Sequence, residues 1–125
     1  MEQNTNAKNV INIEKQVTNI LRDFGVSANI LGYEYLRAAI IMVLDDTSVV
    51  HAVTKILYPA IAKKFDTTSS RVERAIRHAI ESTCERGNQE ALSAFFRRTI
   101  KSKEDKPTNT EFIAAIADDL RLGNE

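Results

Sequence analysis

The sequence is poor in the residues that build disulfide-linked or metal-bound proteins. It has one cysteine, Cys84, in 125 residues, which excludes an internal disulfide and a cysteine-rich metal site. No apolar run approaches the length that crosses a membrane, and the first ten residues have neither the basic nor the apolar region of a secretory signal. We therefore expect a cytoplasmic protein in which Cys84 is a small buried residue.

Sequence motifs of catalysis are also missing. The chain has no glycine-rich phosphate loop, no HExxH and no GxSxG motif. Its two histidines, His51 and His78, fall on different predicted helices, and neither has a cysteine or a carboxylate at metal-ligand spacing. We predict no enzymatic activity, no cofactor and no bound metal.

The charges balance over the whole chain but not locally. Seventeen basic residues stand against seventeen acidic ones, so the general basicity that usually indicates a nucleic-acid partner is absent. Between Lys55 and His78, however, six lysine and arginine residues occur with only two acidic ones. This local excess indicates that one part of the surface is basic.

Apolar residues recur at helical spacing along most of the chain, and no strand pattern is convincing. The stretch Tyr33–Leu44 is apolar nearly all round, which predicts a helix at the centre of the core. We predict an all-α fold with six helices in a single domain, and a short additional segment that Asn88 caps. The predicted helices cover residues 10–24, 33–44, 49–57, 59–65, 70–86 and 111–122.

Local residue types predict where these helices begin and end. Gly25 and Gly87 are expected to stop the helices before them, and Tyr58 to end its helix because a residue before proline avoids the α region. Thr108 and Glu111 fit a capping box at the start of the last helix. We expect a disordered tail over residues 1–10, a domain over residues 11–125, and a charged loop or helix end from Arg97 to Lys106.

The most informative stretch, from Pro59 to Arg86, consists of two predicted helices joined by a tight polar turn. Proline suits the first turn of the first helix, and the run DTT at residues 66–68 then interrupts the helical pattern. The second helix begins on a run of hydroxyl residues. Its cap is either Ser70, with Glu73 completing a capping box, or Thr68. This outline predicts a helix-turn-helix.

A helical wheel divides the second helix into an apolar face and a basic face. The apolar face carries Val72, Ile76, Ala79, Ile80 and Thr83, and the opposite face carries Ser70, Arg74, Arg77 and Glu81, with Arg71, Glu73 and His78 beside them. Arginine donates in pairs to guanine or phosphate, and a recognition helix reads bases in the major groove from its N-terminal half. The alternative is a solvated surface, in which Glu73 pairs with Arg77 four residues further on.

Three runs of sequence resemble a known family. LYPAIAKKFDTTSSRVERAIRHAIE, the earlier GYEYLRAAI and the later KPTNTEFIAAIADDLRL together resemble the C-terminal effector domain of the sporulation master regulator, a phosphorelay response regulator of endospore-forming bacteria. The similarity extends from about Ile11 to Leu122. It implies a six-helix all-α domain whose helix-turn-helix binds short asymmetric boxes in promoter DNA, often as head-to-tail copies. It also implies both activation and repression of transcription at the onset of sporulation.

The resemblance also assigns roles to residues of this chain. It implies that residues of the recognition helix face bases and backbone, that nearby lysines lie close to phosphates, and that Glu73 accepts from a cytosine amino group. The DNA-binding residues predicted in this way are Lys63, Lys64, Ser69, Ser70, Arg71, Glu73, Arg74, Arg77 and His78. The segment around Phe95, Phe96 and Ile100 corresponds to the surface through which the family contacts the primary sigma factor of RNA polymerase. The last helix corresponds to one that helps subunits meet on DNA.

The family normally carries a receiver domain with a phosphorylatable aspartate, for which this chain has neither strands nor room. The sequence fits either an excised effector domain or a stand-alone paralogue, and we expect constitutive but weak binding of the monomer to DNA. The competing hypothesis is a helical protein-interaction module. Such a module would keep the fold, bind a regulator or a sigma factor, and lack specific affinity for DNA.

Overall fold

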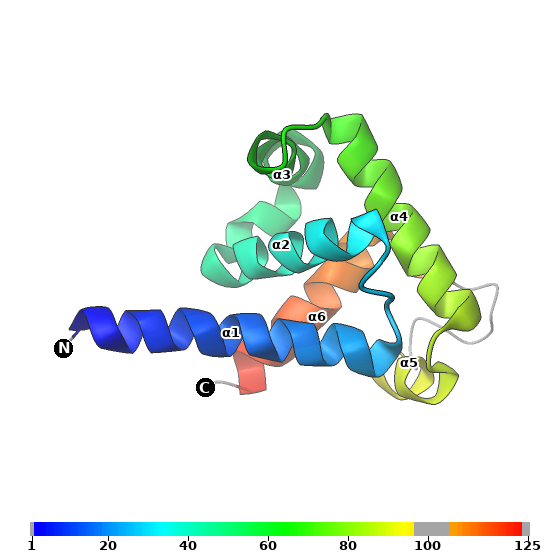
Figure 1. Cartoon of the computed structure of the whole chain (residues 1–125), viewed down its shortest axis with the longest axis horizontal. Coiled ribbons are helices and arrows are strands. Elements are labelled where there is room, and N and C mark those ends of the chain that lie inside the picture. The colour runs from blue at the N-terminus through cyan, green and yellow to red at the C-terminus, as the bar shows by residue number, and fades with distance from the viewer. Residues whose placement is uncertain (1, 97–105, 124–125) are drawn as a thin grey trace.

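The computed structural model describes the backbone of residues 2–96 and 106–123, and this part of the chain contains six α-helices (Figure 1). They are α1 (Glu2–Phe24), α2 (Leu31–Asp45), α3 (Tyr58–Lys64), α4 (Ser69–Arg86), α5 (Gln89–Phe95) and α6 (Asn109–Gly123). A 3₁₀ turn, η1 (Thr47–His51), and a π turn, η2 (Val53–Leu57), connect α2 to α3. No strand occurs among the described residues, and the predicted all-α class is confirmed.

Helix α2 lies at the centre of the fold, as its sequence predicts. It contacts α1, α4 and α6, and Figure 1 shows it between α1 below and α3 above. Because neighbours cover it from several sides, its buried positions occupy more than half of its circumference. These positions are Gly32, Tyr33, Tyr35, Leu36, Ala38, Ala39, Ile40 and Val43.

The structure corrects two predicted helix boundaries near the N-terminus and before α3. Helix α1 begins at Glu2, whereas we predicted a disordered tail over residues 1–10. Once a helix is nucleated, each added residue gains a hydrogen bond at little further cost, so polar residues can extend it. The predicted α-helix over residues 49–57 is likewise wrong, because the chain forms η1 and η2 there.

The π turn explains why the helix does not end at Tyr58. Tyr58 keeps α-helical dihedral angles (φ −62°, ψ −43°) although Pro59 follows it, and its N–H donates to the carbonyl of Val53, five residues earlier. In a regular α-helix a proline ring collides with the carbonyl four residues before it. The wider π turn relieves this collision, because its hydrogen bonds reach back five residues. The chain therefore passes from η2 directly into α3.

Several predicted helix ends are confirmed. Gly25 has a φ of +83° and ends α1. Asn88 caps α5 by accepting from the Ala91 N–H at 3.1 Å. The capping box before α6 forms in both directions: the Thr108 N–H donates to Glu111 Oε1 at 2.9 Å, and the Glu111 N–H donates to Thr108 Oγ1 at 3.1 Å.

Two glycines allow backbones to approach each other where no side chain would fit. A Cβ atom on Gly32 would lie 2.1 Å from the carbonyl oxygen of Ala75, so α2 and α4 touch there through their backbones. At the end of α4, a Cβ on Gly87 would lie 2.4 Å from the Phe24 carbonyl oxygen. That carbonyl also accepts from the Asn88 N–H at 2.9 Å, which joins the C-terminal ends of α1 and α4.

The close contact at Gly32 leads to a prediction about the stability of the domain. Gly32→Ala should destabilise the domain by about 2 kcal/mol, because the added methyl group meets backbone atoms of α4 that cannot rotate away. Gly123→Ala is the matched control, since a Cβ there meets nothing within 4 Å, and it should change stability by less than about 0.5 kcal/mol. Urea unfolding followed by circular dichroism measures both variants. Equal stabilities would show that α2 and α4 can separate without cost.

Candidate nucleic-acid interface

The turn between α3 and α4 has the geometry of a tight helix stop. The Thr67 N–H donates to the Ala62 carbonyl at 2.9 Å, and the Asp66 N–H donates to the Lys63 carbonyl at 3.4 Å, which is a Schellman motif. Asp66 has a φ of +52°, the left-handed conformation that aspartate tolerates better than most residues. It is the only non-glycine residue of the described part with a positive φ. The chain thereby changes direction within the four residues from Phe65 to Thr68 and begins α4.

Helix α4 begins at Ser69, and Thr68 rather than Ser70 is its cap. The Thr68 hydroxyl accepts from the Arg71 N–H at 3.2 Å. The alternative box with Glu73 does not form, because the carboxylate of Glu73 pairs with Arg77 instead. The apolar face predicted by the wheel is confirmed, and its buried residues are Val72, Ile76, Ala79, Ile80, Thr83 and Cys84. Burial raises the pKa of the Cys84 thiol, in keeping with a structural residue.

The predicted DNA-binding residues lie on α3 and α4, on either side of the turn at Asp66. The exposed ones are Lys63, Lys64, Ser70, Arg71, Arg74, Arg77 and His78, and we call this set the recognition surface. Ser69 and Glu73 are partly buried beside it. Exposed residues of α3 and α4 lie near each other because the two helices are in contact and joined by the turn at Asp66.

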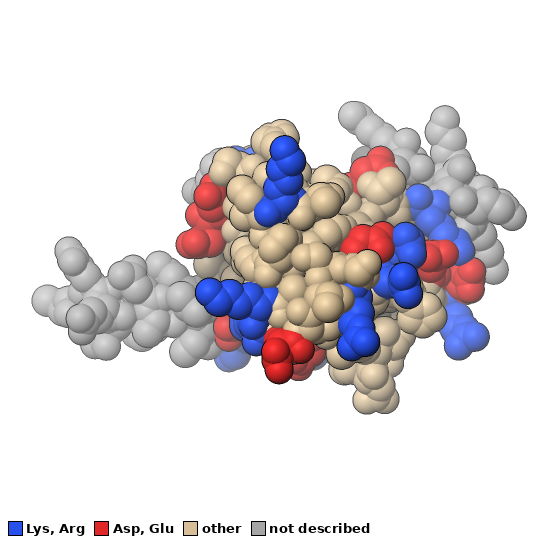
Figure 2. Space-filling view, turned by 90° about the horizontal axis from the view of Figure 1, so that it is seen from above, with Lys and Arg blue, Asp and Glu red and all other residues tan. Residues whose placement is uncertain are grey.

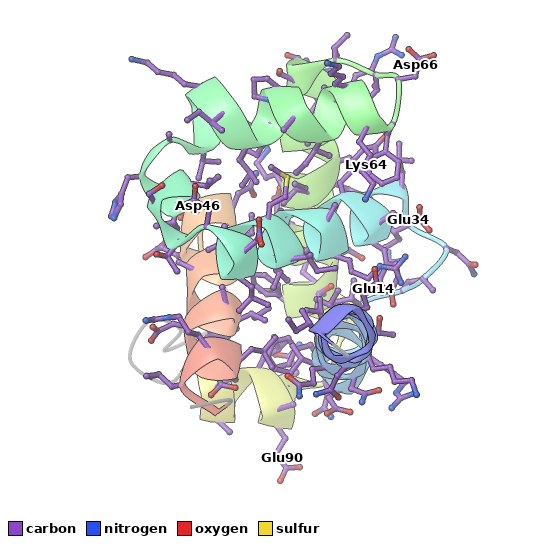
Figure 3. All side chains as sticks on the ribbon, turned by 90° about the vertical axis from the view of Figure 1, so that its left-hand side faces the viewer. Glu14, Glu34, Asp46, Lys64, Asp66 and Glu90 are labelled. Carbon is purple, nitrogen blue, oxygen red and sulfur yellow. The ribbon has the colours of Figure 1, made fainter. Side chains whose placement is uncertain are left out.

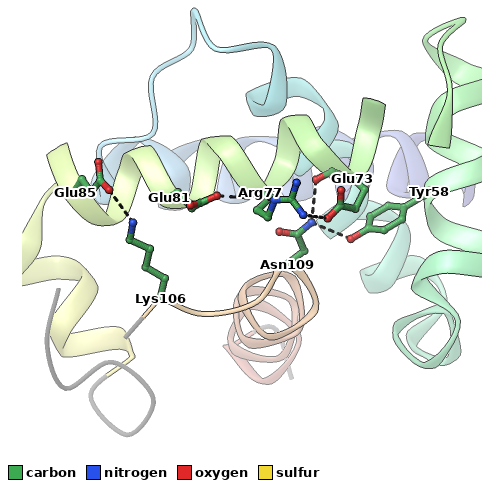
Figure 4. A network of polar contacts seen from close by, with 7 residues as sticks. All are labelled: Tyr58, Glu73, Arg77, Glu81, Glu85, Lys106 and Asn109. Carbon is green, nitrogen blue, oxygen red and sulfur yellow. Dashed lines mark hydrogen bonds and ion pairs between the residues drawn. The ribbon is translucent and has the colours of Figure 1, made fainter. Parts of the chain in front are cut away.

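Arginines of α4 differ in their partners. Arg77 pairs with Glu73 at 2.7 Å and lies 3.9 Å from a carboxylate oxygen of Glu81 (Figure 4). The side chains of Arg77 and Glu73 are 53% and 35% exposed, so their ion pair is screened by solvent and contributes only about 0.3–0.5 kcal/mol. Arg71 and Arg74 form no ion pair within the described part of the chain. Two guanidinium groups are thus available to a ligand, and a third can exchange its partners at low cost.

Seen from above α3 and α4, the molecule presents basic side chains that are separated from one another (Figure 2). Blue and red groups alternate around a tan centre, and no continuous basic patch covers this face. The two kinds of charge, which balance to a net charge of zero over the whole chain, are thus also interspersed on this face. Such a surface favours contacts at defined positions over general attraction to a polyanion.

Lys64 lies at the border of the recognition surface. Together with Glu14, Glu34, Arg37 and Phe65 it lines a small pocket of about 150 Å³ between α1, α2 and α3. Figure 3 shows Lys64 above Glu34, with Glu14 below on α1. The Lys64 ammonium also lies 5.6 Å from the centre of the Phe65 ring, a distance at which a cation interacts with the ring face.

Asn109 is not among the residues predicted from the sequence, although it contacts the backbone of α4. Its Nδ2 atom donates to the Tyr58 hydroxyl at 3.0 Å and to the Glu73 carbonyl oxygen at 3.1 Å (Figure 4). Burial raises the pKa of the Tyr58 hydroxyl, and the hydrogen bond from Asn109 opposes this effect. Thr108 and Glu111 indicated that a helix starts here, but no local pattern indicates which distant groups its first residue meets.

The predicted sigma-factor segment is only partly at the surface. Phe96 is 3% exposed, and its ring centre lies 5.3 Å from that of Phe112 and 5.9 Å from that of Phe24. Its ring therefore belongs to the core and is not open to a partner. Phe95 is partly buried against Phe24, with ring centres 5.1 Å apart. Ile100 and the rest of the segment 97–105 lie outside the described residues.

The described residues contain no group of three or more His, Cys, Asp or Glu side chains that could hold a metal ion. None of the described helices is long and apolar enough to cross a membrane.

A comparison with protein families agrees with this geometry and with the resemblance found in the sequence. The family model described as "Sporulation initiation factor Spo0A C terminal" matches residues 17–120, from the second half of α1 to the end of the core-facing part of α6. This family is a DNA-binding regulatory domain of sporulation and is not a known enzyme family. The chain therefore belongs to the family of the C-terminal, DNA-binding domain of the sporulation initiation factor Spo0A.

Proposed function

We propose that this domain binds specific boxes in promoter DNA and thereby controls transcription at the initiation of sporulation, with α4 as the recognition helix. The observation that carries the proposal is the state of Arg71 and Arg74. Both are exposed on the N-terminal half of α4, and neither forms an ion pair within the described part of the chain. The opposite face of the same helix is buried, so the two side chains are held in a defined direction.

Different residues of the recognition surface can contact the bases and the phosphates of DNA. A helix of this diameter enters the major groove, where arginine donates in pairs to the O6 and N7 atoms of guanine. We assign this role to Arg74 and Arg77, and the phosphate contacts to Lys63, Lys64 and Arg71. We assign further contacts with the DNA backbone to Ser69, Ser70 and His78. The contacts with phosphates position the protein, and the contacts with bases specify the sequence.

Glu73 has a different proposed role from the basic residues. Its carboxylate is held 2.7 Å from Arg77, so the two groups form one hydrogen-bonding unit with an acceptor beside a donor. A carboxylate accepts from the exocyclic amine of cytosine, and a guanidinium group donates to guanine. The pair thus suits two neighbouring bases on one strand, a cytosine and a guanine. It also suits a single C·G base pair, in which Glu73 would contact the cytosine and Arg77 the guanine.

Partners other than DNA are further parts of the proposal. Head-to-tail copies on tandem boxes would bring α6 near a neighbouring subunit. Contact with the primary sigma factor would involve the segment that contains Ile100 and the exposed edge of Phe95, and the burial of Phe96 removes its ring from such a contact. Activation and repression would then depend on where the box lies relative to the promoter. We place this activity in the cytoplasm.

The proposal is tested by fluorescence-anisotropy titration of the domain against a duplex with the family's box and against a scrambled duplex, at two salt concentrations. We expect a preference for the box well above tenfold. We also expect a linear fall of log affinity with log salt that reports several phosphate contacts. Equal and weak binding to both duplexes would overturn the proposal. It would favour the protein-interaction module, which is then tested by direct titration with a sigma factor.

Arg74 and Lys64 should respond differently in this assay. Arg74→Ala should weaken binding to the box by about 1–3 kcal/mol and leave binding to scrambled DNA nearly unchanged, because it removes a contact with a base. Lys64→Ala should weaken binding to both duplexes alike and reduce the salt slope by about 1, because it removes a contact with a phosphate. Identical losses for the two variants would contradict the division of roles.

Removing the carboxylate of Glu73 should have opposite effects on the two duplexes. Glu73→Ala should reduce discrimination by about 1–3 kcal/mol at one base pair, while affinity for scrambled DNA rises because one repulsive charge is lost. Glu81→Ala is the matched control, since it also removes a carboxylate beside Arg77 but lies two turns further along α4. It should raise affinity for scrambled DNA without reducing discrimination. A loss of discrimination in both variants would show that only the charge of Arg77 matters.

A further inference from the structure

The buried polar residues of the described part, tyrosines apart, are Thr83 and Asn109, and their hydrogen bonds differ in kind. The Thr83 hydroxyl donates to the Ala79 carbonyl at 2.7 Å, so this bond stays within α4. Asn109 belongs to α6, yet its Nδ2 atom donates to Tyr58 on α3 and to the backbone of Glu73 on α4. One buried amide nitrogen therefore connects three helices.

The atom that Asn109 contacts on α4 is a backbone atom at the level of the recognition surface. The carbonyl oxygen of Glu73 can accept this bond with its second lone pair while it takes part in the helix. The side chain of Glu73 points outward, and its carboxylate accepts a hydrogen bond from Arg77. Any displacement of this peptide group would also displace the Cβ atoms of Glu73 and of Arg74, which follows it. Asn109 is thus coupled to the exposed residues through the backbone and touches none of their charged groups.

Asn109 is itself held firmly at the start of α6. The reciprocal bonds of Thr108 and Glu111 fix the first turn of this helix. Just before it, Lys106 pairs with Glu85 of α4 at 2.7 Å (Figure 4). The beginning of α6 therefore contacts α4 at two points, Glu73 and Glu85, which are about 18 Å apart at the helical rise of 1.5 Å per residue. The Lys106–Glu85 pair is exposed to solvent and contributes little, so the largely buried bonds of Asn109 are the main polar restraint between the start of α6 and α4.

Such a restraint matters because the tightest contact of α4 lies at one place. Helix α4 touches α2 through the backbone of Ala75, where Gly32 lacks a side chain. This packing fixes the side of α4 that faces α2, and the contacts with α3 and α6 add restraints on the side that α2 does not cover. The bond from Asn109 lies about half a turn from Ala75, on the side of α4 that faces α3 and α6.

We propose that Asn109 is a positioning residue for sequence recognition: by holding the Glu73 peptide group, it sets the angle and rotation of α4 that let the recognition surface meet bases. The inference rests on the proposed function. Contacts with base edges need side chains placed within about 0.5 Å, whereas long basic side chains reach phosphates from many positions. Loss of the Asn109 bonds should therefore reduce discrimination between sequences more than it reduces general affinity for DNA.

The test compares Asn109→Ala with two control variants. Thr83→Ala also removes a buried polar group next to the core, but its bond lies within α4. Tyr58→Phe removes the hydroxyl partner on α3 and leaves the bond from Asn109 to Glu73. Each variant is titrated by fluorescence anisotropy with the box and the scrambled duplex, at a temperature well below its own unfolding midpoint. If Asn109→Ala does not fold, Asn109→Ser replaces it, since its shorter side chain keeps a hydroxyl donor that does not reach both partners.

We expect the ratio of the two dissociation constants to fall at least tenfold for Asn109→Ala, with affinity for scrambled DNA changed less than twofold. Thr83→Ala and Tyr58→Phe should keep the ratio within threefold of the wild-type value, even if they lower thermal stability as much as Asn109→Ala does. A wild-type ratio in Asn109→Ala would overturn the proposal, because a purely structural role affects stability alone. A tenfold fall of this ratio in Thr83→Ala would also overturn the proposal, because any loss of a buried polar group would then have the same effect.

A measurement without DNA separates this inference from the proposed function. Backbone amide shifts in ¹H–¹⁵N spectra should change from Ser69 to His78 in Asn109→Ala and stay unchanged there in Tyr58→Phe. If the wild type does not discriminate between duplexes, the proposed function fails. These spectra then decide whether Asn109 positions α4. Unchanged shifts over the first half of α4 would overturn the positioning role in either case.

Discussion

The backbone contact between α2 and α4 is the constraint on which the rest of the structure depends. Because Gly32 has no side chain, α4 can lie directly on α2, and the small residues Ala75 and Ala79 continue this close packing. A larger residue at any of these positions would separate the two helices and open a gap, which a closely packed interior does not tolerate. The contact places one face of α4 deep in the core, and the other face is left to carry the basic residues.

Helix α3 is defined by two unusual backbone conformations, one at each end. Tyr58 remains helical before a proline because a π turn precedes it, and Asp66 adopts a left-handed conformation after the helix. Both cost free energy locally. They persist because the side chains between them are buried, Ile61 completely and Tyr58 and Ala62 nearly so. Burial of this short helix therefore determines where α4 begins and in which direction it runs.

Polar interactions in this domain fall into two groups with different consequences. The hydrogen bonds of Asn109 join largely buried groups on three helices, so they help to define geometry. The exposed pairs, such as that of Glu73 with Arg77, are screened and weak, so their members can exchange partners for a ligand. A DNA-binding surface benefits from this division. Its backbone is held by buried groups, while its charged side chains remain available.

The secondary structure of this domain was largely determined by local sequence. The apolar stripe of α4 and the cap at Asn88 follow from residues within one or two turns of each other. The box of Thr108 with Glu111 is equally local. The candidate site was predictable to the same extent, because Arg71, Arg74 and Arg77 belong to one helix and their exposure follows from its buried face. The family could be recognised for the same reason, since its most specific run of residues is continuous.

Other features were decided only by tertiary structure. The choice of Thr68 as the cap, the π turn before Pro59 and the burial of Phe96 depend on which helices meet, and local propensities do not contain that information. The same holds for Gly32 and Asn109, whose partners lie 43 and 36 residues away in the sequence. The sequence by itself therefore determined most of the helices and the basic face of α4. Packing decided the angle and the register at which that face is presented, because these depend on contacts between residues that only the folded chain brings together.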